Sequence, residues 1–361
     1  MKKIAILLVL LLGAGIFLGS RLQNMSIATQ DSNAIDAFGR FRISRPFNVF
    51  DMQFTYDLEP LFFEEVATGG GDVTHVANSS AARLTTGGAT SGDGVKFQTF
   101  EYFRYQPGKS HLIVFTTILG SKTSNVRKRI GYFDDDNGFF FEQDGSNFKV
   151  VRRTKTSGAV VDNAINQSLW NLDVLDGTGS SGITLDESKD NIYVIDFQWL
   201  GAGRIRFGMD FGGQITYVHE IKFANTESVP FTVTGDLPFR AEIFNTAAAS
   251  GANTFDFTCV AIMSEGGFNP LGLSGSTESP VLRNVTTGNE PLPIISIRPR
   301  ATFQGITFRG VVVPKSYSLI SEDATISYQL IFGGTLTGAV FADVDTVNSG
   351  VQADASATAI T

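Results

Sequence analysis

Cysteine and histidine are scarce in this chain of 361 residues. The single cysteine, Cys259, excludes an intrachain disulfide and any zinc site built from cysteines. Three histidines leave little material for histidine-based catalysis or metal binding. Two catalytic motifs are missing as well: residues 69–71 are a glycine run with no Lys-Ser/Thr behind it, and no Gly-x-Ser-x-Gly elbow occurs. Composition alone therefore indicates no particular activity.

A surplus of positive charge is also missing, because Lys and Arg number 28 against 36 Asp and Glu. General affinity for nucleic acid needs clustered cations, so we expect no nucleic acid partner. Basic residues concentrate only at Lys122, 127–129, Arg152, Arg153 and Lys155. We interpret them as the solvated edge of a sheet, protected by Lys and Arg. A patch for an acidic partner is the alternative.

Long hydrophobic runs are limited to Ile4–Leu18, which follows Lys2 and Lys3. As a helix this run would span roughly 22 Å, short of a bilayer core of about 30 Å. It fits the apolar region of a signal peptide or a short anchor. Alternatively, the protein begins at Met25, which is a natural start for a soluble protein. Residues 1–24 would then be a mis-assigned start. A membrane is expected as a partner only if residues 4–18 are retained.

Glycine and phenylalanine, in contrast, are abundant, with 38 and 31 residues. Phe packs well on pleated surfaces and Gly supplies tight turns, so the pair indicates a β-rich core. Apolar residues alternate through 191–200 and, after a Gly-rich turn, through 204–211, which is a β-hairpin signal. We predict a shared buried interior that contains Phe197, Trp199, Phe207 and Phe257.

Turn signals recur about every ten residues, which predicts an all-β fold: a jelly-roll-like two-sheet β-sandwich followed by a smaller β domain. We assign residues 25–44 to an N-terminal arm and 45–265 to the sandwich. A Gly- and Pro-rich linker, 266–293, leads to a small C-terminal β domain, 294–361, with strands at 294–298, 305–313 and 325–332. A short helix is allowed at 164–172. Because no partner strand follows 339–347, we expect a truncated domain or one completed by a neighbour.

Two acidic segments are the candidates for chemistry. Asp134, Asp135 and Asp136 could ligate Ca²⁺ through hard oxygens, although Asn137-Gly138 favours a simple turn. This is the one cofactor that the sequence suggests.

The second segment could bind a sugar through the carboxylates of Asp173, Asp176 and Asp186 beneath the ring of Trp170. A rigid structural loop is the alternative and the favoured interpretation.

The lone Cys259 lies in a strand with Phe255, Phe257, Ala261 and Met263 on its face, so we predict that it is buried as a small hydrophobe.

Several stretches are more specific than a β pattern requires. They are Asp36-Ala37-Phe38-Gly39-Arg40, Tyr105-Gln106-Pro107-Gly108, Gly131-Tyr132-Phe133-Asp134, Trp170-Asn171, Trp199-Leu200-Gly201 and Ser264-Glu265-Gly266-Gly267. Through them, residues 26–345 resemble a family of virion structural proteins of tailed bacteriophages, common among marine and cyanobacterial phages. The resemblance implies a particle component and no chemistry.

We therefore predict a non-enzymatic virion structural protein of the head, tail or fibre. Its expected partners are other virion proteins and further copies of itself. Its expected location is the virion; alternatively, it is exported or anchored in a membrane through residues 1–24. The first alternative is a carbohydrate-binding surface module that recognises a host surface glycan. The second is a polysaccharide depolymerase, which would need two carboxylates roughly 5–10 Å apart.

Overall fold

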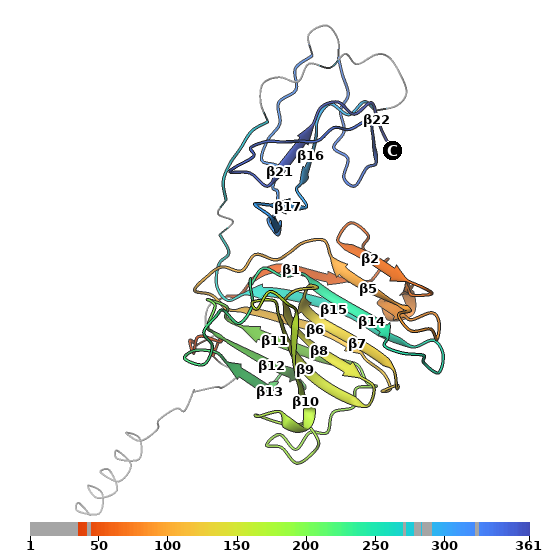
Figure 1. Ribbon diagram of the computed structural model, residues 1–361, viewed down its shortest axis with the longest axis vertical. Helices are drawn as coiled ribbons and strands as arrows, with labels where there is room; N and C mark the ends of the chain where they lie inside the picture. Colours follow the sequence, from red (N-terminus) through yellow and green to blue (C-terminus); the bar gives the residue numbers. More distant parts are fainter. Residues whose placement is uncertain (1–34, 42–44, 270–271, 278–282, 284–290, 322–324) are drawn as a thin grey trace, which may run out of the picture.

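The computed structural model describes residues 35–41, 45–269, 272–277, 283, 291–321 and 325–361 (Figure 1). Within these ranges the chain consists of strands and connecting loops, with two 3₁₀ turns at Ala77–Ser79 and Gln167–Leu169. The all-β prediction is confirmed. None of the helical segments in these ranges has the length and apolarity to cross a membrane. The predicted leader, 1–24, lies outside the described residues.

Two antiparallel sheets pack face to face as a β-sandwich (Figure 1). The first has eight strands in the order β13-β12-β11-β6-β15-β4-β3, and β1 also pairs with β15. Its strands are β1 (Phe47–Gln53), β3 (Asp72–Val76), β4 (Ala81–Thr85), β6 (His111–Ile118), β11 (Asn191–Phe197), β12 (Arg204–Asp210), β13 (Ile215–Lys222) and β15 (Thr254–Ser264).

The second sheet has seven strands in the order β10-β9-β8-β7-β14-β5-β2. Its strands are β2 (Phe63–Thr68), β5 (Gly94–Thr99), β7 (Val126–Phe133), β8 (Gly138–Asp144), β9 (Asn147–Thr154), β10 (Val161–Asn166) and β14 (Phe239–Asn245). Residues 164–172, where a helix was allowed, instead continue β10 and form the second 3₁₀ turn.

The interior between the sheets is built largely from phenylalanine. Phe115 and Phe141, from opposite sheets, have ring centroids 6.2 Å apart, and Phe239 and Phe257 lie 5.1 Å apart. Such aromatic pairs add roughly 0.5–1.5 kcal/mol beyond the area that they bury. The predicted burial of Phe197, Phe207 and Phe257 is confirmed.

Trp199 differs from this prediction, because it is only half-buried. It lies two residues beyond the end of β11, at the margin of the core, where its ring packs against the buried cluster. Its indole Nε1 donates a hydrogen bond of 2.9 Å to Oγ1 of Thr232. The alternation that places Phe197 inside thus weakens where the strand pairing stops.

The prediction for Cys259 is wrong, and a β-bulge explains why. The pairing of β15 with β6 shifts register between Phe257 and Cys259. One extra residue in a strand moves every following side chain to the opposite face. Val260 and Ile262 therefore face the core, and Cys259 is half-buried on the other side, with its Sγ 3.3 Å from Oγ1 of Thr116.

The C-terminal residues form three small antiparallel units. They comprise β16 (Ser296–Pro299), β20 (Ala342–Asp343) and β21 (Val351–Asp354) in one sheet, β17 (Thr302–Phe303) with β18 (Ile306–Thr307), and β19 (Leu336–Thr337) with β22 (Ala359–Ile360). Ala342 pairs with Ala353 and Asp343 with Gln352. The expectation that 339–347 has no partner strand in the chain is therefore wrong.

The described part of the N-terminal arm, residues 35–41, is bonded to the sandwich by two arginines of β12. Nε of Arg204 donates to the Ala37 carbonyl at 2.8 Å, and Arg206 donates to the Ile35 carbonyl at 2.8 Å. Asp36 shapes the turn, because its Oδ1 accepts the backbone N–H groups of Phe38 and Arg40 at 2.9 Å each. The Asp36-Ala37-Phe38-Gly39-Arg40 motif is thus a structural clasp.

Candidate functional site

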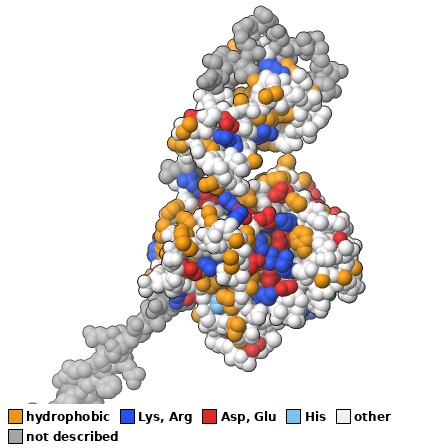
Figure 2. Space-filling model, in the orientation of Figure 1, with side chains coloured by type: hydrophobic (Ala, Val, Ile, Leu, Met, Phe, Trp, Pro, Cys, Tyr) orange, Lys and Arg blue, Asp and Glu red, His pale blue; other side chains and the backbone are white. Residues whose placement is uncertain are grey.

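A row of alternating charges crosses the outer face of the seven-stranded sheet. Strand pairing places Lys96 opposite Glu242, Glu242 opposite Arg129, Arg129 opposite Glu142, and Glu142 opposite Lys149. Directly opposed residues of antiparallel strands share one face of the sheet. These five residues, from β5, β14, β7, β8 and β9, form what we call the charged row. Figure 2 shows blue and red side chains gathered on this part of the sandwich.

Arg129 is the centre of the charged row. Its Nε donates to Oε2 of Glu142 at 2.6 Å, and a terminal nitrogen donates to Oε1 of Glu242 at 3.3 Å. Its guanidinium also lies over the ring of Phe140, 5.1 Å from the centroid. All three charged side chains are buried. Buried charges persist only when they are paired and hydrogen-bonded, and here each carboxylate has a cation.

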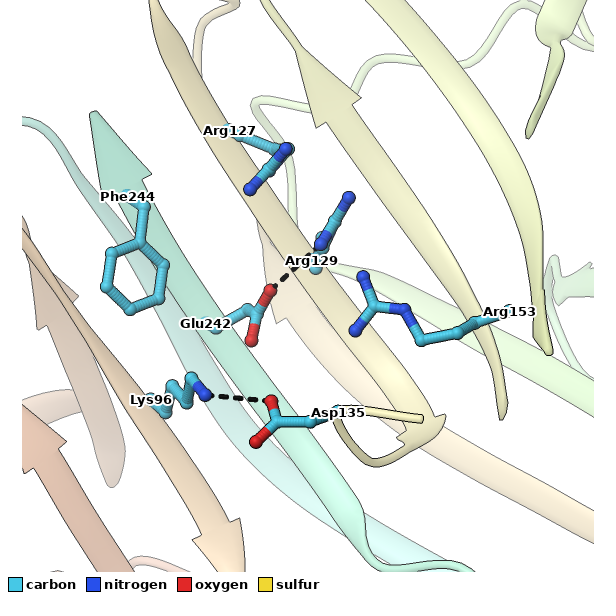
Figure 3. A pocket seen from close by; sticks show the side chains of 7 residues that line it. All are labelled: Lys96, Arg127, Arg129, Asp135, Arg153, Glu242 and Phe244. Carbon is cyan, nitrogen blue, oxygen red and sulfur yellow. Dashed lines mark hydrogen bonds and ion pairs between the residues drawn. The ribbon is translucent and has the colours of Figure 1, made fainter. Parts of the chain in front are cut away.

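A hollow of about 320 Å³ opens beside the charged row (Figure 3). Its lining is Lys96, Arg127, Arg129, Asp135, Arg153, Glu242 and Phe244. Four cations thus face two carboxylates, although the whole chain carries a net charge of -8. A positive concavity on a negative protein favours the approach of an anion.

Asp135 is held in its ionised form at the rim of this hollow. Burial acts to raise its pKa, but the Arg240 guanidinium and the Lys96 ammonium outweigh burial and bring the pKa to about 2. Oδ1 of Asp135 accepts from Lys96 at 2.8 Å and from Arg240 at 2.7 Å. Asp135 therefore fixes the position of Lys96 and offers its remaining oxygen as an acceptor.

Arg127 differs from its neighbours in the hollow. Within the described ranges its guanidinium has no hydrogen-bond or ion-pair partner, and the side chain is half-buried. Burial and then the adjacent Arg129 cation lower the pKa of Arg127, and Glu142 and Glu242 offset this only in part. A half-buried cation without a bonded counter-charge is a ready site for a carboxylate or sulfate.

The predicted calcium ligands lie at the turn between β7 and β8 and have separate partners. Oδ1 of Asp134 accepts the backbone N–H of Asn137 at 2.7 Å, and its Oδ2 pairs with Arg309 at 2.8 Å. Asp136 pairs with Lys155 at 2.9 Å, and Asp135 with Lys96. The described part of the chain holds no group of three acidic, His or Cys residues arranged around a metal. The structure does not bring these carboxylates together as Ca²⁺ ligands.

The predicted sugar-binding residues are also not brought together. Trp170 is buried against Phe148, with ring centroids 5.6 Å apart, so its face is not an open plate. Asp173 is buried and accepts the backbone N–H of Ser181 at 2.8 Å. Asp176 and Asp186 are exposed and close local turns by accepting from residues two positions later, Thr178 and Ser188. These four residues shape a loop.

Local sequence patterns do not predict the charged row, although one signal of it is visible. Residues 127–129 stood out as a basic concentration and were interpreted as a protected sheet edge. That interpretation is wrong, because β7 is an interior strand between β8 and β14. The register that sets Arg129 between Glu142 and Glu242 joins segments far apart in the chain, and no local pattern encodes it.

No protein-family model and no curated protein matches the chain. Among solved structures it is similar to a β-1,3-glucanase from Mycobacterium marinum, with 14% identity, 60% of this chain and 98% of the other covered, and a TM-score of 0.38. A putative β-glucanase from Mycobacterium abscessus has 12% identity, 60% and 100% coverage, and a TM-score of 0.40. A glycosyl hydrolase family 16 protein from Mycobacterium smegmatis has 13% identity, 60% and 100% coverage, and a TM-score of 0.37.

These comparisons correct the prediction of a non-enzymatic virion structural protein. The similar structures are described as glucanases, glycosyl hydrolases and a transglycosylase, and none of those named is a virion protein. The prediction that the chain is not an enzyme is corrected by the same finding. At these TM-scores the likeness assigns no activity, so a function must be argued from the site itself.

Proposed function

We propose that the protein binds an acidic carbohydrate in the hollow beside the charged row. The observation that carries this proposal is Arg127, a half-buried guanidinium with no bonded partner in the described ranges, in a hollow where cations outnumber carboxylates. A guanidinium matches the geometry of a carboxylate or sulfate and binds it through two parallel hydrogen bonds. Lys96 and Arg153 line the same space, and each is already paired with a carboxylate, Lys96 with Asp135 and Arg153 with Asp162.

The remaining lining fits a sugar better than a bare inorganic anion. Glu242 and Asp135 present oxygens that can accept hydrogen bonds from hydroxyl groups. Phe244 contributes an apolar surface against which the carbon-bound hydrogens of a sugar ring can pack (Figure 3). A hollow of about 320 Å³ lies at the lower end of the usual range for small-ligand pockets. It therefore suits one or two acidic residues of a longer chain.

Cleavage of the bound polysaccharide is the second candidate function. It is favoured by Glu142 and Glu242, whose carboxylates bond to opposite parts of one guanidinium. A guanidinium between two carboxylates spaces them by roughly 5–8 Å, within the range of glycosidase carboxyl pairs. Both carboxylates are, however, engaged in ion pairs with Arg129, whereas a glycosidase needs its two carboxyl groups free to face the scissile bond. Binding is for this reason the first candidate.

The test is calorimetric titration of the full chain with polygalacturonate, a sulfated glycan and the neutral glucan laminarin. We expect the two acidic chains to bind and laminarin not to bind. Arg127→Gln should weaken binding at least tenfold, because it removes the unpaired cation. Arg83→Gln is the matched control: Arg83 lies on the other sheet, exposed, and pairs with Asp256. Equal binding of laminarin, or unchanged binding by Arg127→Gln, would contradict the proposal.

Cleavage is measured in the same samples by the release of reducing ends. If the second candidate function is right, Glu242→Gln abolishes release. Binding without release by the wild-type chain would leave the protein as a binding module and would exclude cleavage of the polymers tested.

A further inference from the structure

A segment of the C-terminal unit exposes strand-like apolar sequence to solvent. It consists of residues 309–321 and 325–334, which we call the apolar arm. Apolar side chains recur at every second position at Val311 and Val313 and at Tyr328, Leu330 and Phe332, with further apolar residues between them at Val312 and Ile331. A period of two is the signature of a β-strand with one buried face. Both parts nevertheless lack strand structure.

Backbone hydrogen bonds to other described segments are absent over residues 309–320 and 325–334 of the apolar arm. Backbone hydrogen bonds flank it, from Phe308 to Ala301 and from Thr335 to Thr361, but none joins residues 309–320 or 325–334 to another described segment. The two parts do lie together, because the rings of Tyr317 and Tyr328 meet edge to face at 5.6 Å. The apolar arm is thus a pair of extended segments with backbone groups open to pairing, which is a template for added strands.

The exposed apolar surface is large enough for a stable interface. The exposed members are Val311, Val313, Tyr317, Leu319, Ile320, Tyr328, Leu330, Ile331 and Phe332. Together they expose on the order of 1,000 Å², compared with about 800 Å² that each partner contributes to a standard interface. Monomeric soluble proteins rarely expose contiguous apolar patches larger than a few hundred Å².

We propose that the apolar arm is the self-association surface of this protein, and that its occupant is the apolar arm of a second copy of the chain. Charge supports this choice. Arg309 is already paired with Asp134, and Lys315 donates to Oγ of Ser274, so the two cations of the arm are engaged within their own copy. The described residues of two such arms, 309–321 and 325–334, can therefore meet without facing unpaired like charges.

Pairing between copies would account for both the backbone groups without partners and the exposed apolar side chains. Added strands would provide partners for the open backbone groups, and the alternating side chains of one arm would cover those of the other. A closed, symmetric oligomer uses the same surface on every copy, so no apolar surface is left over. This inference is independent of the proposed carbohydrate site, which lies on the sandwich.

The test is sedimentation of the full chain over a range of micromolar concentrations, with Leu330→Asp and the matched control Leu61→Asp. Leu330 is 66% exposed and Leu61, on the sandwich, is 71% exposed, so neither substitution removes a buried side chain. We expect the wild type and Leu61→Asp to form the same oligomer. Leu330→Asp should raise the dissociation constant at least tenfold.

Hydrogen exchange identifies the surface itself. Amides of residues 309–321 and 325–334 should exchange slowly in the oligomer and rapidly in Leu330→Asp. A monomeric wild type, or an oligomer that Leu330→Asp leaves intact, would overturn the proposal. Slow exchange of the arm in a monomer would also overturn it, because the occupant would then be another segment of the same chain.

Discussion

His111 is a neutral histidine enclosed by aromatic rings in the sandwich. Its ring lies 5.3 Å from Tyr105 and 5.7 Å from Phe197, and the side chain is fully buried. Neither ring nitrogen has a hydrogen-bond partner within the described ranges. Burial, and to a lesser extent the Lys109 cation, lower the pKa of His111 to about 3. The fold thus accepts this side chain only without a proton.

We predict an acid-labile fold with His111 as one cause. Between pH 6.5 and about 3 the unfolded chain binds a proton at this residue and the folded chain does not, so stability falls as the pH falls. At pH 3 the loss amounts to about 4 kcal/mol. His111→Phe should remove this part of the pH dependence in urea unfolding measured from pH 7 to pH 4. An unchanged pH profile in the variant would refute the assignment.

Arg206 is an enclosed charged residue, paired with Asp196 and lying 4.2 Å from the ring centroid of Tyr217. Both charged side chains are buried. We predict that Arg206→Met lowers the free energy of unfolding by about 3–5 kcal/mol, because a carboxylate stays buried without its cation. The double variant Arg206→Met/Asp196→Leu should recover much of this loss in chemical denaturation. A double variant that is less stable than the single one would show that packing, and not charge, dominates.

Among the strands, local alternation predicted β11 and β12 well and β15 only in part. In β11 and β12, polar residues such as Asp196 and Arg206 separate the apolar ones, so the side that faces the phenylalanine core is clear from the sequence, although both faces are buried. The second half of β15 is apolar at almost every position, so the sequence cannot tell which face is inside. The bulge decides it, and the bulge depends on pairing with β6 and β1.

We predict opposite sensitivities at two adjacent positions of β15. Val260→Ser should lower the free energy of unfolding by about 2–4 kcal/mol, since it places a hydroxyl in the core. Cys259→Ser should cost less than about 1 kcal/mol, because the side chain is half-buried outside the core. Urea denaturation of the two variants checks this. If Cys259→Ser lowered the free energy of unfolding more than Val260→Ser, the result would instead support the sequence prediction that Cys259 faces the core.

The candidate site shows the same limit of sequence analysis. The basic residues 127–129 were visible, but Glu142 and Glu242 gain meaning only through the register of β7 with β8 and β14. Conversely, Asp173 and Asp176 stood out because acidic residues and glycines cluster there, yet they bond to their own loop. Composition locates charge, whereas strand pairing decides which charges meet.

The molecule as a whole carries two surfaces with opposite responses to salt. The hollow is lined by cations, and screening weakens their attraction for an anion. The apolar arm buries nonpolar surface, which sulfate strengthens. We predict that added salt raises the dissociation constant for an acidic glycan, less steeply in Arg127→Gln, while the oligomer persists. Glycan binding that is insensitive to salt in titrations would contradict the electrostatic account of the hollow.

The order of the strands in space also bears on how the protein is made. In each sheet an interior strand comes late in the chain: β14 lies between β5 and β7, and β15 between β6 and β4. At roughly 5–20 residues per second, a ribosome needs on the order of 10–40 s to pass from β1 to β15. Until β14 and β15 emerge, their neighbours β5, β7, β6 and β4 each lack one pairing partner. A nascent chain of this design therefore exposes unpaired strand edges until its last sandwich strand has emerged.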